Sequence, residues 1–274
     1  MAADRLSPEE VARYREQGYI VPRYRVPAAR LAAMRALLER LIAENPGRRP
    51  EHLVLRWGGG VAARPTDAAF LDHARDPEIL DLVEQLIGPD IVLWGSHVFC
   101  KPAGHGLEVP WHQDGQYWPI RPLASVTVWL ALDASRRENG CLRVIPGSHR
   151  TQSIYHHRLD ERPALAINQV VDDARFDEGR AVDVELEAGQ LSIHDVYMLH
   201  GSRPNRSDQR RAGFASRYMP ATSLYDRSIA FPGGSAGIKQ NMALRPIYLV
   251  RGQDRAGNDF SLGQDRPFQV GDDG

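Results

Sequence analysis

Short apolar segments separated by turn residues fill the chain between Gly88 and about residue 250, and this pattern constrains the fold most. The segments are rich in β-branched and aromatic residues, and Gly and Pro residues punctuate them. Their sequences are DIVLWGSHVFC, ASVTVWLALD, CLRVI, AVDVELEAG, QLSIHDVYMLH, AGFASRYM and PIYLV. Many short strands with turn signals between them predict a β-sandwich or β-barrel rather than βαβ units.

The N-terminal part of the chain has helical periodicity instead. Ser7, followed by a proline and then by Glu10, predicts a capping box at the start of a first helix, which we expect to end at Gly18. Apolar residues at helical spacing predict a second helix over about 27–44 and a third over about 76–88. These apolar stripes are typical of core packing.

We expect one domain over residues 1–274, because no linker or internal repeat divides the sequence. In this domain residues 1–88 are mostly helical and residues 89–250 form the β core. A long polar insertion lies near residues 151–180, and such loops often cover a site. The tail, residues 252–274, is rich in Gly, Asp, Gln and Arg, so we expect part of it to be disordered.

The charge balance argues against two classes of partner. The chain has 34 basic and 35 acidic side chains, a net charge of −1, so nothing indicates a nucleic-acid or membrane-surface binder. No apolar run approaches the ~20 residues that span a bilayer, and the charged N-terminus has no apolar secretory segment. Cys100 and Cys141 are too few for a disulfide framework or a CxxC zinc ribbon. We therefore expect a cytoplasmic protein with a small-molecule partner; the sequence leaves its oligomeric state open.

One short motif has the spacing of metal ligands. His112 and Asp114 are two residues apart, and in an extended chain such residues face the same side, roughly 6–7 Å apart. Both can then bind one ion while Gln113 points away. His200, 86 residues beyond Asp114 at the end of another strand-like segment, would complete a 2-His-1-carboxylate set, which suits Fe(II) oxygenases. A chance HxD and a polar strand end at a turn are the alternatives for the separate pieces.

Residues around His200 bear on the choice of the third ligand. His194 lies six residues earlier and has the same strand parity, so it competes with His200. We favour His200 because Gly201, Ser202 and then Arg211 follow it in register. Arg211 begins the next strand-like segment, and a planar guanidinium can bind a carboxylate with two hydrogen bonds.

The ordered combination of these motifs resembles the phytanoyl-CoA dioxygenase family of Fe(II)/2-oxoglutarate-dependent oxygenases. The resemblance covers about residues 5–220 and rests on His112-Gln113-Asp114, Glu138-Asn139-Gly140-Cys141-Leu142, Pro146-Gly147-Ser148-His149, and His200-Gly201-Ser202 with Asn205 and Arg211. It implies a mainly β fold with flanking helices around a double-stranded β-helix, the cupin-like jelly roll. It also implies Fe(II) as cofactor, and 2-oxoglutarate and O2 as co-substrates. The implied reaction hydroxylates or otherwise oxidises a small organic metabolite and releases succinate and CO2.

The resemblance also implies roles for single residues. The implied iron ligands are His112, Asp114 and His200. The implied 2-oxoglutarate contacts are Arg211 at the distal carboxylate, Ser202 and Trp129 beside it, and either His97 or Lys101. Because Asp114 is present where related halogenases have a small residue, the resemblance favours hydroxylation over halogenation.

The residues themselves support a cup with one lined face. Along Ser125–Asp133 the even positions are all aliphatic and the odd positions are mixed, so one face can join a core while the other lines a cavity. We expect Tyr117, Trp118 and Arg217 to face the substrate. Packing at the rim of the cup explains the two aromatic residues equally well, and an acidic neighbour is the alternative partner for Arg217.

Two other classes of function remain open at this stage. A cupin-like isomerase or hydrolase would use the same metal site without O2, but it would have no use for Arg211. A non-catalytic jelly-roll binding protein is the second alternative. The substrate cannot be predicted, because fold-level kinship does not select one.

Overall fold

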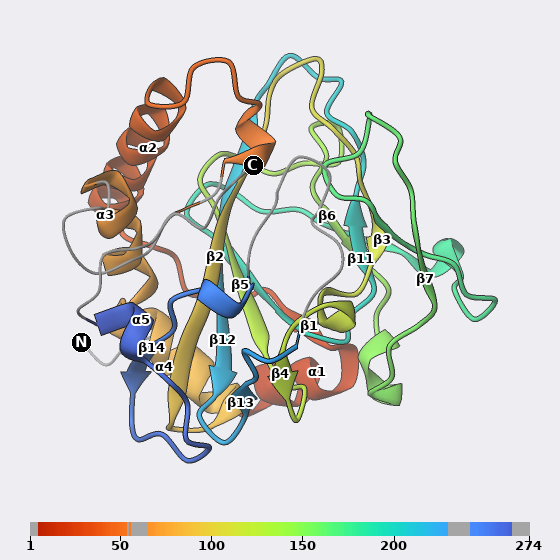
Figure 1. Ribbon diagram of the computed structural model, residues 1–274. Helices are drawn as coiled ribbons and strands as arrows, with labels where there is room; N and C mark the ends of the chain where they lie inside the picture. Colours follow the sequence, from red (N-terminus) through yellow and green to blue (C-terminus); the bar gives the residue numbers. More distant parts are fainter. Residues whose placement is uncertain (1–4, 54, 56–64, 230–241, 265–274) are drawn as a thin grey trace.

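The computed structural model describes residues 5–53, 55, 65–229 and 242–264 and contains two antiparallel sheets with helices on one side (Figure 1). The larger sheet has the order β1 (Tyr19–Ile20), β10 (Leu191–Asp195), β5 (Val126–Ala131), β12 (Arg211–Pro220), β2 (Ile91–Lys101), β14 (Tyr248–Arg251). The smaller sheet has the order β3 (Val109–His112), β11 (His200–Ser202), β6 (Leu142–Val144), β9 (Val182–Val184). Two-stranded ribbons pair β13 (Leu224–Tyr225) with β4 (Ile120–Arg121), and β7 (His157–Leu159) with β8 (Gln169–Val171). The fold is the expected jelly roll.

The helices flank the larger sheet. They are α1 (Pro8–Gln17), α2 (Ala28–Ala43), α3 (Pro65–Ala74), α4 (Pro77–Ile87) and α5 (Ser261–Gln264), with 3₁₀ turns η1 (Pro50–His52), η2 (Asp114–Gln116), η3 (Ser148–Thr151), η4 (Glu178–Arg180) and η5 (Met242–Leu244). The predicted first, second and third helices correspond to α1, α2 and α4, whereas α3 was not predicted. None of the described helices is long and apolar enough to cross a membrane.

The predicted start of α1 is a capping box in the structure. Ser7 Oγ accepts a hydrogen bond from the Glu10 amide, and the Glu10 carboxylate accepts one from the Ser7 amide. Together these bonds satisfy two backbone donors that a helix start leaves free. Gly18 ends the helix in the left-handed region at φ 79°, a conformation that favours glycine.

The two faces of β5 have the composition that the alternation predicted. Its even-numbered residues, Val126, Val128 and Leu130, pack in the main hydrophobic core with residues of α2, α3 and α4. Trp129, at an odd position, packs instead between the two sheets against residues of the smaller sheet such as Val144. The inner face of the larger sheet is therefore the floor of a cup, and its outer face is closed by helices.

The insertion near residues 151–180 lies beside the smaller sheet. It carries β7 and β8, and its Leu165 forms a parallel bridge with Glu108 just before β3. Part of the C-terminal tail is also folded, because Asn258 accepts a hydrogen bond from the Tyr225 amide and donates one to Asp254. Residues 265–274 of the tail lie outside the described residues.

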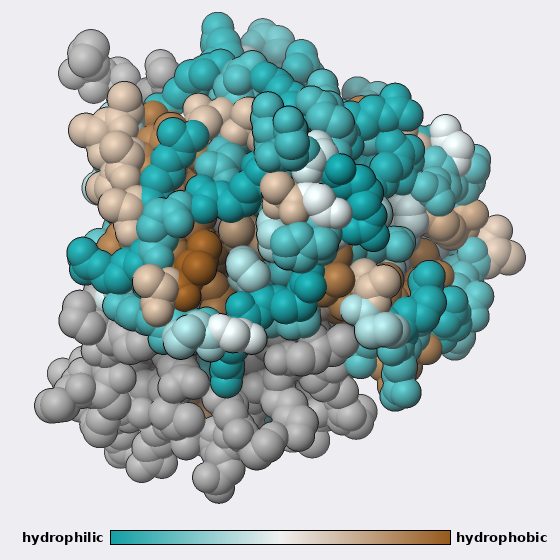
Figure 2. Space-filling model, turned by 90° about the horizontal axis from the view of Figure 1, so that it is seen from above, coloured by the Kyte–Doolittle hydropathy of each residue, from teal (hydrophilic) through white to brown (hydrophobic). Residues whose placement is uncertain are grey.

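The face of the molecule seen in Figure 2 is mostly hydrophilic where the described residues form it. Among the described residues, the exposed large hydrophobic side chains are Leu159 and Val182. These two side chains lie in different strands and do not form an extended apolar surface.

Candidate functional site

Strand pairing brings the two distant histidines together. In the smaller sheet His200 of β11 lies directly opposite His112 of β3, and their ring centroids are 4.2 Å apart. Asp114 opens η2 two residues after His112, with the intervening residue extended, so its carboxylate returns to the same side. Asp114 Oδ1 lies 3.7 Å from His112 Nε2, and Asp114 Oδ2 lies 3.9 Å from His200 Nε2.

Backbone carbonyls fix the orientation of both imidazoles. His112 Nδ1 is 2.8 Å from the Pro110 oxygen, and His200 Nδ1 is 3.0 Å from the Met198 oxygen. Because a carbonyl oxygen only accepts hydrogen bonds, each Nδ1 carries the proton. Each Nε2 then presents a lone pair toward Asp114, which is the usual way a protein orients a histidine for a metal.

The charge state of these groups suits metal binding. Burial alone would raise the pKa of Asp114, but the imidazoles of His112 and His194, the nearby His200 and the Arg217 guanidinium together hold it well below its usual value. Burial, together with the adjacent His112 ring, lowers the pKa of His200 well below its usual value. Asp114 is thus an anion and His200 is neutral, the forms in which both ligate metals.

Within the described residues, His112, Asp114 and His200 are the one set of three or more His, Cys, Asp or Glu side chains whose ligand atoms all lie within 4.8 Å of one another. Two imidazoles and one carboxylate on one side of a cavity form the facial arrangement that non-haem Fe(II) sites use. The residues present therefore fit a ferrous ion.

Gln113, between two of these residues, points away from them as expected and is fully buried. Its Nε2 donates to the carbonyls of Ser153 and Tyr197, at 3.1 and 2.8 Å, and its Oε1 accepts from the Tyr155 amide at 2.6 Å. Its own amide donates to His157 Nε2 at 3.0 Å. These bonds connect the loop between His112 and Asp114 to the insertion and to the segment before β11.

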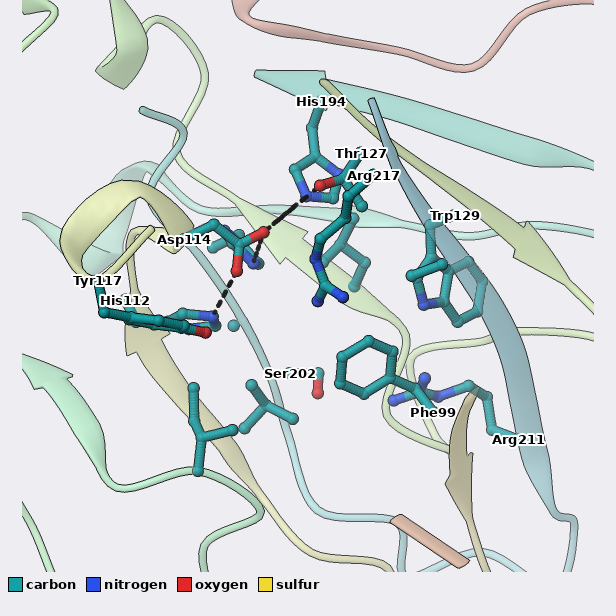
Figure 3. Close-up of a pocket in the computed structure, with 16 residues that line it drawn as sticks. Phe99, His112, Asp114, Tyr117, Thr127, Trp129, His194, Ser202, Arg211 and Arg217 are labelled. Atoms are coloured by element: carbon teal, nitrogen blue, oxygen red, sulfur yellow. Dashed lines mark hydrogen bonds and ion pairs between the residues drawn. The ribbon is translucent and has the colours of Figure 1, made fainter. Parts of the chain in front are cut away.

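His194 reaches the same cavity from β10 of the larger sheet (Figure 3). Its Nε2 is 3.9 Å from Asp114 Oδ2, and neither of its ring nitrogens has a hydrogen-bond partner, although the residue is only 2% exposed. Thr127, its cross-strand neighbour, places Oγ1 3.5 Å from the same carboxylate oxygen. The two residues flank Asp114 on the side away from His112.

At the other end of the cavity Arg211 lies against Trp129. The side chain is buried, with Cζ 5.3 Å from the centre of the Trp129 ring and Nε without a hydrogen-bond partner. Burial lowers the pKa of Arg211 to about 10. Gly213 makes this packing possible, because a Cβ there would lie 2.0 Å from the Trp129 indole. Ser202 also lines the cavity.

The structure brings together most, though not all, of the residues predicted to line the site. Those that line the cavity are His112, Asp114, Tyr117, Trp129, His200, Ser202, Arg211 and Arg217. Lys101 lines none of it, because its ammonium donates to the carbonyls of Ser202 and Arg203. His97 also lies outside: its Nε2 is 3.2 Å from the Glu51 carbonyl, and its ring packs on Phe99.

Trp118 is a core residue rather than part of the cavity lining. It is 2% exposed, and its ring packs edge-on against Trp94 with a centroid distance of 4.3 Å. The explanation by packing therefore holds for Trp118, while its neighbour Tyr117 lines the cavity.

Phe99, Thr127 and Ile167 also line the cavity, although none of them is among the site residues expected from the sequence. The sequence carries a signal for Phe99 and Thr127, because they share strand parity with Lys101 and Trp129, two of the expected site residues. Ile167 belongs to the insertion, where no periodicity marks a lining residue.

Comparison with known proteins finds matches over long stretches of the chain. A family model described as phytanoyl-CoA dioxygenase (PhyH) matches residues 14–213. A "Probable phytanoyl-CoA dioxygenase" of Caenorhabditis elegans is 28% identical over 238 residues, 78% of this chain and 75% of that protein. A "Probable alpha-ketoglutarate-dependent hypophosphite dioxygenase" of Stutzerimonas stutzeri is 33% identical, over 54% of this chain and 51% of that protein.

The solved structures of known proteins include a similar complex. The structure of CytC3 with Fe(II) and alpha-ketoglutarate superposes with a TM-score of 0.63 at 25% identity, covering 93% of this chain and 92% of that one. The similarity therefore includes nearly the whole fold.

Proposed function

The chain belongs to the phytanoyl-CoA dioxygenase family of Fe(II)- and 2-oxoglutarate-dependent dioxygenases, and from that premise we propose that it hydroxylates a small organic molecule with His112, Asp114 and His200 as iron ligands. One observation carries the proposal. Three donors from two distant segments meet on one side of a cavity whose far end holds Arg211, a buried arginine with no acidic partner within 4.0 Å among the described residues.

We assign 2-oxoglutarate to the space between the iron ligands and Arg211. The guanidinium would bind the distal carboxylate with two hydrogen bonds, and Trp129 would hold the guanidinium in place from one side. Ser202, from the strand that begins with His200, is positioned to donate a further hydrogen bond. Bound iron and 2-oxoglutarate supply the O2-dependent oxidation, in which 2-oxoglutarate becomes succinate and CO2.

The chain's own part in the reaction is to bind, to orient and to keep water out. The apolar side chains of Phe99, Leu142 and Ile167 line the cavity between the charged groups. A dry cavity strengthens every charge interaction inside it and protects a reactive centre from side reactions. Ile167 comes from the insertion, which therefore forms one wall of the proposed substrate site.

Asp114 supports hydroxylation rather than halogenation, because its carboxylate occupies the position that a halide would need. The cavity takes a small molecule, and we propose that the protein meets it in the cytoplasm. Cys100 and Cys141 are both buried free thiols, which is usual in a reducing compartment.

The direct test is an anaerobic titration of the Fe(II)-loaded protein with 2-oxoglutarate, followed by the weak visible charge-transfer band of an Fe(II)–keto-acid chelate. We expect the wild-type band to saturate, and R211Q to require about 100-fold more 2-oxoglutarate, since a buried charge pair is lost. R210Q is the matched control, because Arg210 pairs with Asp133 outside the cavity. The absence of any band with wild-type protein would refute the proposal.

A further inference from the structure

The cavity contains a second arginine, Arg217, that the proposed function does not use. It lies six residues after Arg211 on β12 and faces the same cavity. Gly213 and Ala215 stand between the two arginines along that face, and the Trp129 ring packs over Gly213. Figure 3 shows the Arg217 guanidinium directed into the cavity, between Asp114 and the Phe99 ring.

Arg217 is held by ring faces rather than by acids. Its Cζ lies 5.4 Å from the ring centre of Trp118 and 5.9 Å from that of Phe99. In the described part of the chain no carboxylate oxygen lies within 4.0 Å of its nitrogens, and its buried Nε has no hydrogen-bond partner. By contrast, Arg143 and Arg251 each bind two carboxylates.

An uncompensated guanidinium beside a cavity is expensive to desolvate and attracts an anion. Asp114 does not neutralise it, because a bound iron engages that carboxylate. The charged side chains that line the cavity are Asp114, Arg211 and Arg217, which sum to one positive charge. Fe(II) and the dianion of 2-oxoglutarate cancel each other, so one positive charge remains when both are bound.

A third arginine strengthens the positive field behind Arg217. Gly95 of β2 is the cross-strand neighbour of Arg217, and a Cβ on it would lie 2.9 Å from Arg245 Nη1 and 3.9 Å from Arg217 Cδ. The Arg245 guanidinium lies 5.8 Å from the ring of Trp94 and forms no ion pair with a described residue. Two cations therefore lie next to each other over a residue without a side chain, and only Arg217 borders the cavity.

We propose that the substrate is an anion, a small molecule whose carboxylate or phosphate group binds Arg217 while its oxidised carbon lies beside the iron ligands. This inference rests on the proposed function of the site. Arg217 and Arg211 are six residues apart on β12, about 20 Å along the backbone, and in the view of Figure 3 the Phe99 ring lies between their guanidinium groups. Arg217 therefore serves a second oxyanion, and the planar guanidinium fits one with two hydrogen bonds.

The test uses probes of matched shape and different charge. Benzoate, phenyl phosphate and neutral benzamide are titrated by calorimetry into the anaerobic complex of the full-length protein with Fe(II) and 2-oxoglutarate. We expect one or both anions to bind the wild type at least about 10-fold more tightly than benzamide, and R217Q to lose this difference. R217K should keep part of this preference for anions, because an ammonium retains the positive charge but lacks the paired N–H groups of the guanidinium. The two anions distinguish a carboxylate from a phosphate substrate.

Two controls separate this inference from the proposed function. R137Q, at an exposed arginine outside the cavity, should bind all probes as the wild type does. R217Q should bind 2-oxoglutarate within about 3-fold of the wild type and should unfold at a similar temperature. If benzamide binds as tightly as the anions, if no probe binds, or if R217Q weakens 2-oxoglutarate as R211Q does, the inference is wrong. A wild-type protein that forms no Fe(II)–2-oxoglutarate complex would instead refute the proposed function.

Discussion

The two ends of the cavity are built on different sheets, and their polar groups are hydrogen-bonded within the protein to different extents. The end that holds His112, Asp114 and His200 rests on short strands of the smaller sheet, where backbone carbonyls fix both imidazoles. The end that holds Arg211 and the flank that holds Arg217 rest on the long strand β12 of the larger sheet, where each guanidinium keeps a buried Nε without a partner.

This difference indicates which interactions each region makes before its ligands arrive. At the metal end the hydrogen bonds inside the protein already select the ring orientation, so little rearrangement is needed to bind an ion. At the arginines the bonding capacity remains open, so anions from solution complete it. The following substitutions test that division, beginning with the largest expected effect.

D114A should remove the metal end while leaving the arginines in place. We expect 2-oxoglutarate turnover to fall by more than about 100-fold, because loss of a ligand exceeds the 10–100-fold typical of outer-shell changes. Metal analysis of protein purified without chelator should show the loss of iron. The thermal midpoint should change little, since the substitution removes a buried charge, and D72A at an exposed carboxylate is the control. Wild-type iron content in D114A would contradict the assignment of the ligand.

G213A should damage only the arginine end. The added methyl group would lie 2.0 Å from the Trp129 indole, so the ring must move away from Arg211. We expect 2-oxoglutarate to bind roughly 10-fold more weakly, with a loss of about 1–3 kcal/mol in unfolding free energy from overpacking. Iron content should be unchanged. Adding W129F, which makes room for the methyl group, should restore stability; loss of iron in G213A would argue against two separable ends.

Q113L should weaken the metal end without removing a ligand. Leucine cannot replace the bonds to Ser153, Tyr155 and Tyr197, and each buried polar group left unpaired costs about 1–3 kcal/mol. We expect a marked loss of unfolding free energy in denaturant titrations and about 10-fold weaker Fe(II) binding. Q113E keeps an acceptor but no donor and should be intermediate. Equal iron affinity in Q113L and wild type would show that the loop is rigid without this side chain.

H194Q should give the smallest effect. His194 lies 3.9 Å from Asp114 Oδ2 as a neighbour of the metal group, so we expect Fe(II) affinity to fall by less than about 10-fold. H200Q, its matched partner, should lose far more iron. Equal losses in the two variants would make His194 a ligand as well and would extend the metal end into the larger sheet.

Local sequence patterns predicted much of the fold because the forces behind them are local. The capping box at Ser7 and Glu10 and the aliphatic face of Val126 to Leu132 depend on residues a few positions apart. Helix α3 was missed, although Phe70 is fully buried in it, because its ten residues show only a weak apolar stripe.

For the site, the sequence predicts which residues share one face of a strand, but not which distant strands pair. Parity places His112 and Asp114 on one side, but the choice between His194 and His200 depends on pairing across 88 residues, which puts His200 opposite His112. Parity also failed to separate Phe99 from Lys101, which share a face. Their positions along β2 separate the two residues. Phe99 lines the cavity, whereas the Lys101 ammonium donates to carbonyls near the end of β11.

The hydrogen bonds of Gln113 have a consequence for how substrate range can diverge on this scaffold. In the insertion, the Gln113 side chain bonds to main-chain atoms of Ser153 and Tyr155, so the identity of those two side chains is free to vary. The Gln113 amide donates to the side chain of His157, which must therefore be kept. New specificities can therefore arise by replacing side chains along the wall that includes Ile167, at no cost to metal retention. Grafting a loop that follows a different path would break the same bonds, and selectivity would then change together with loss of iron.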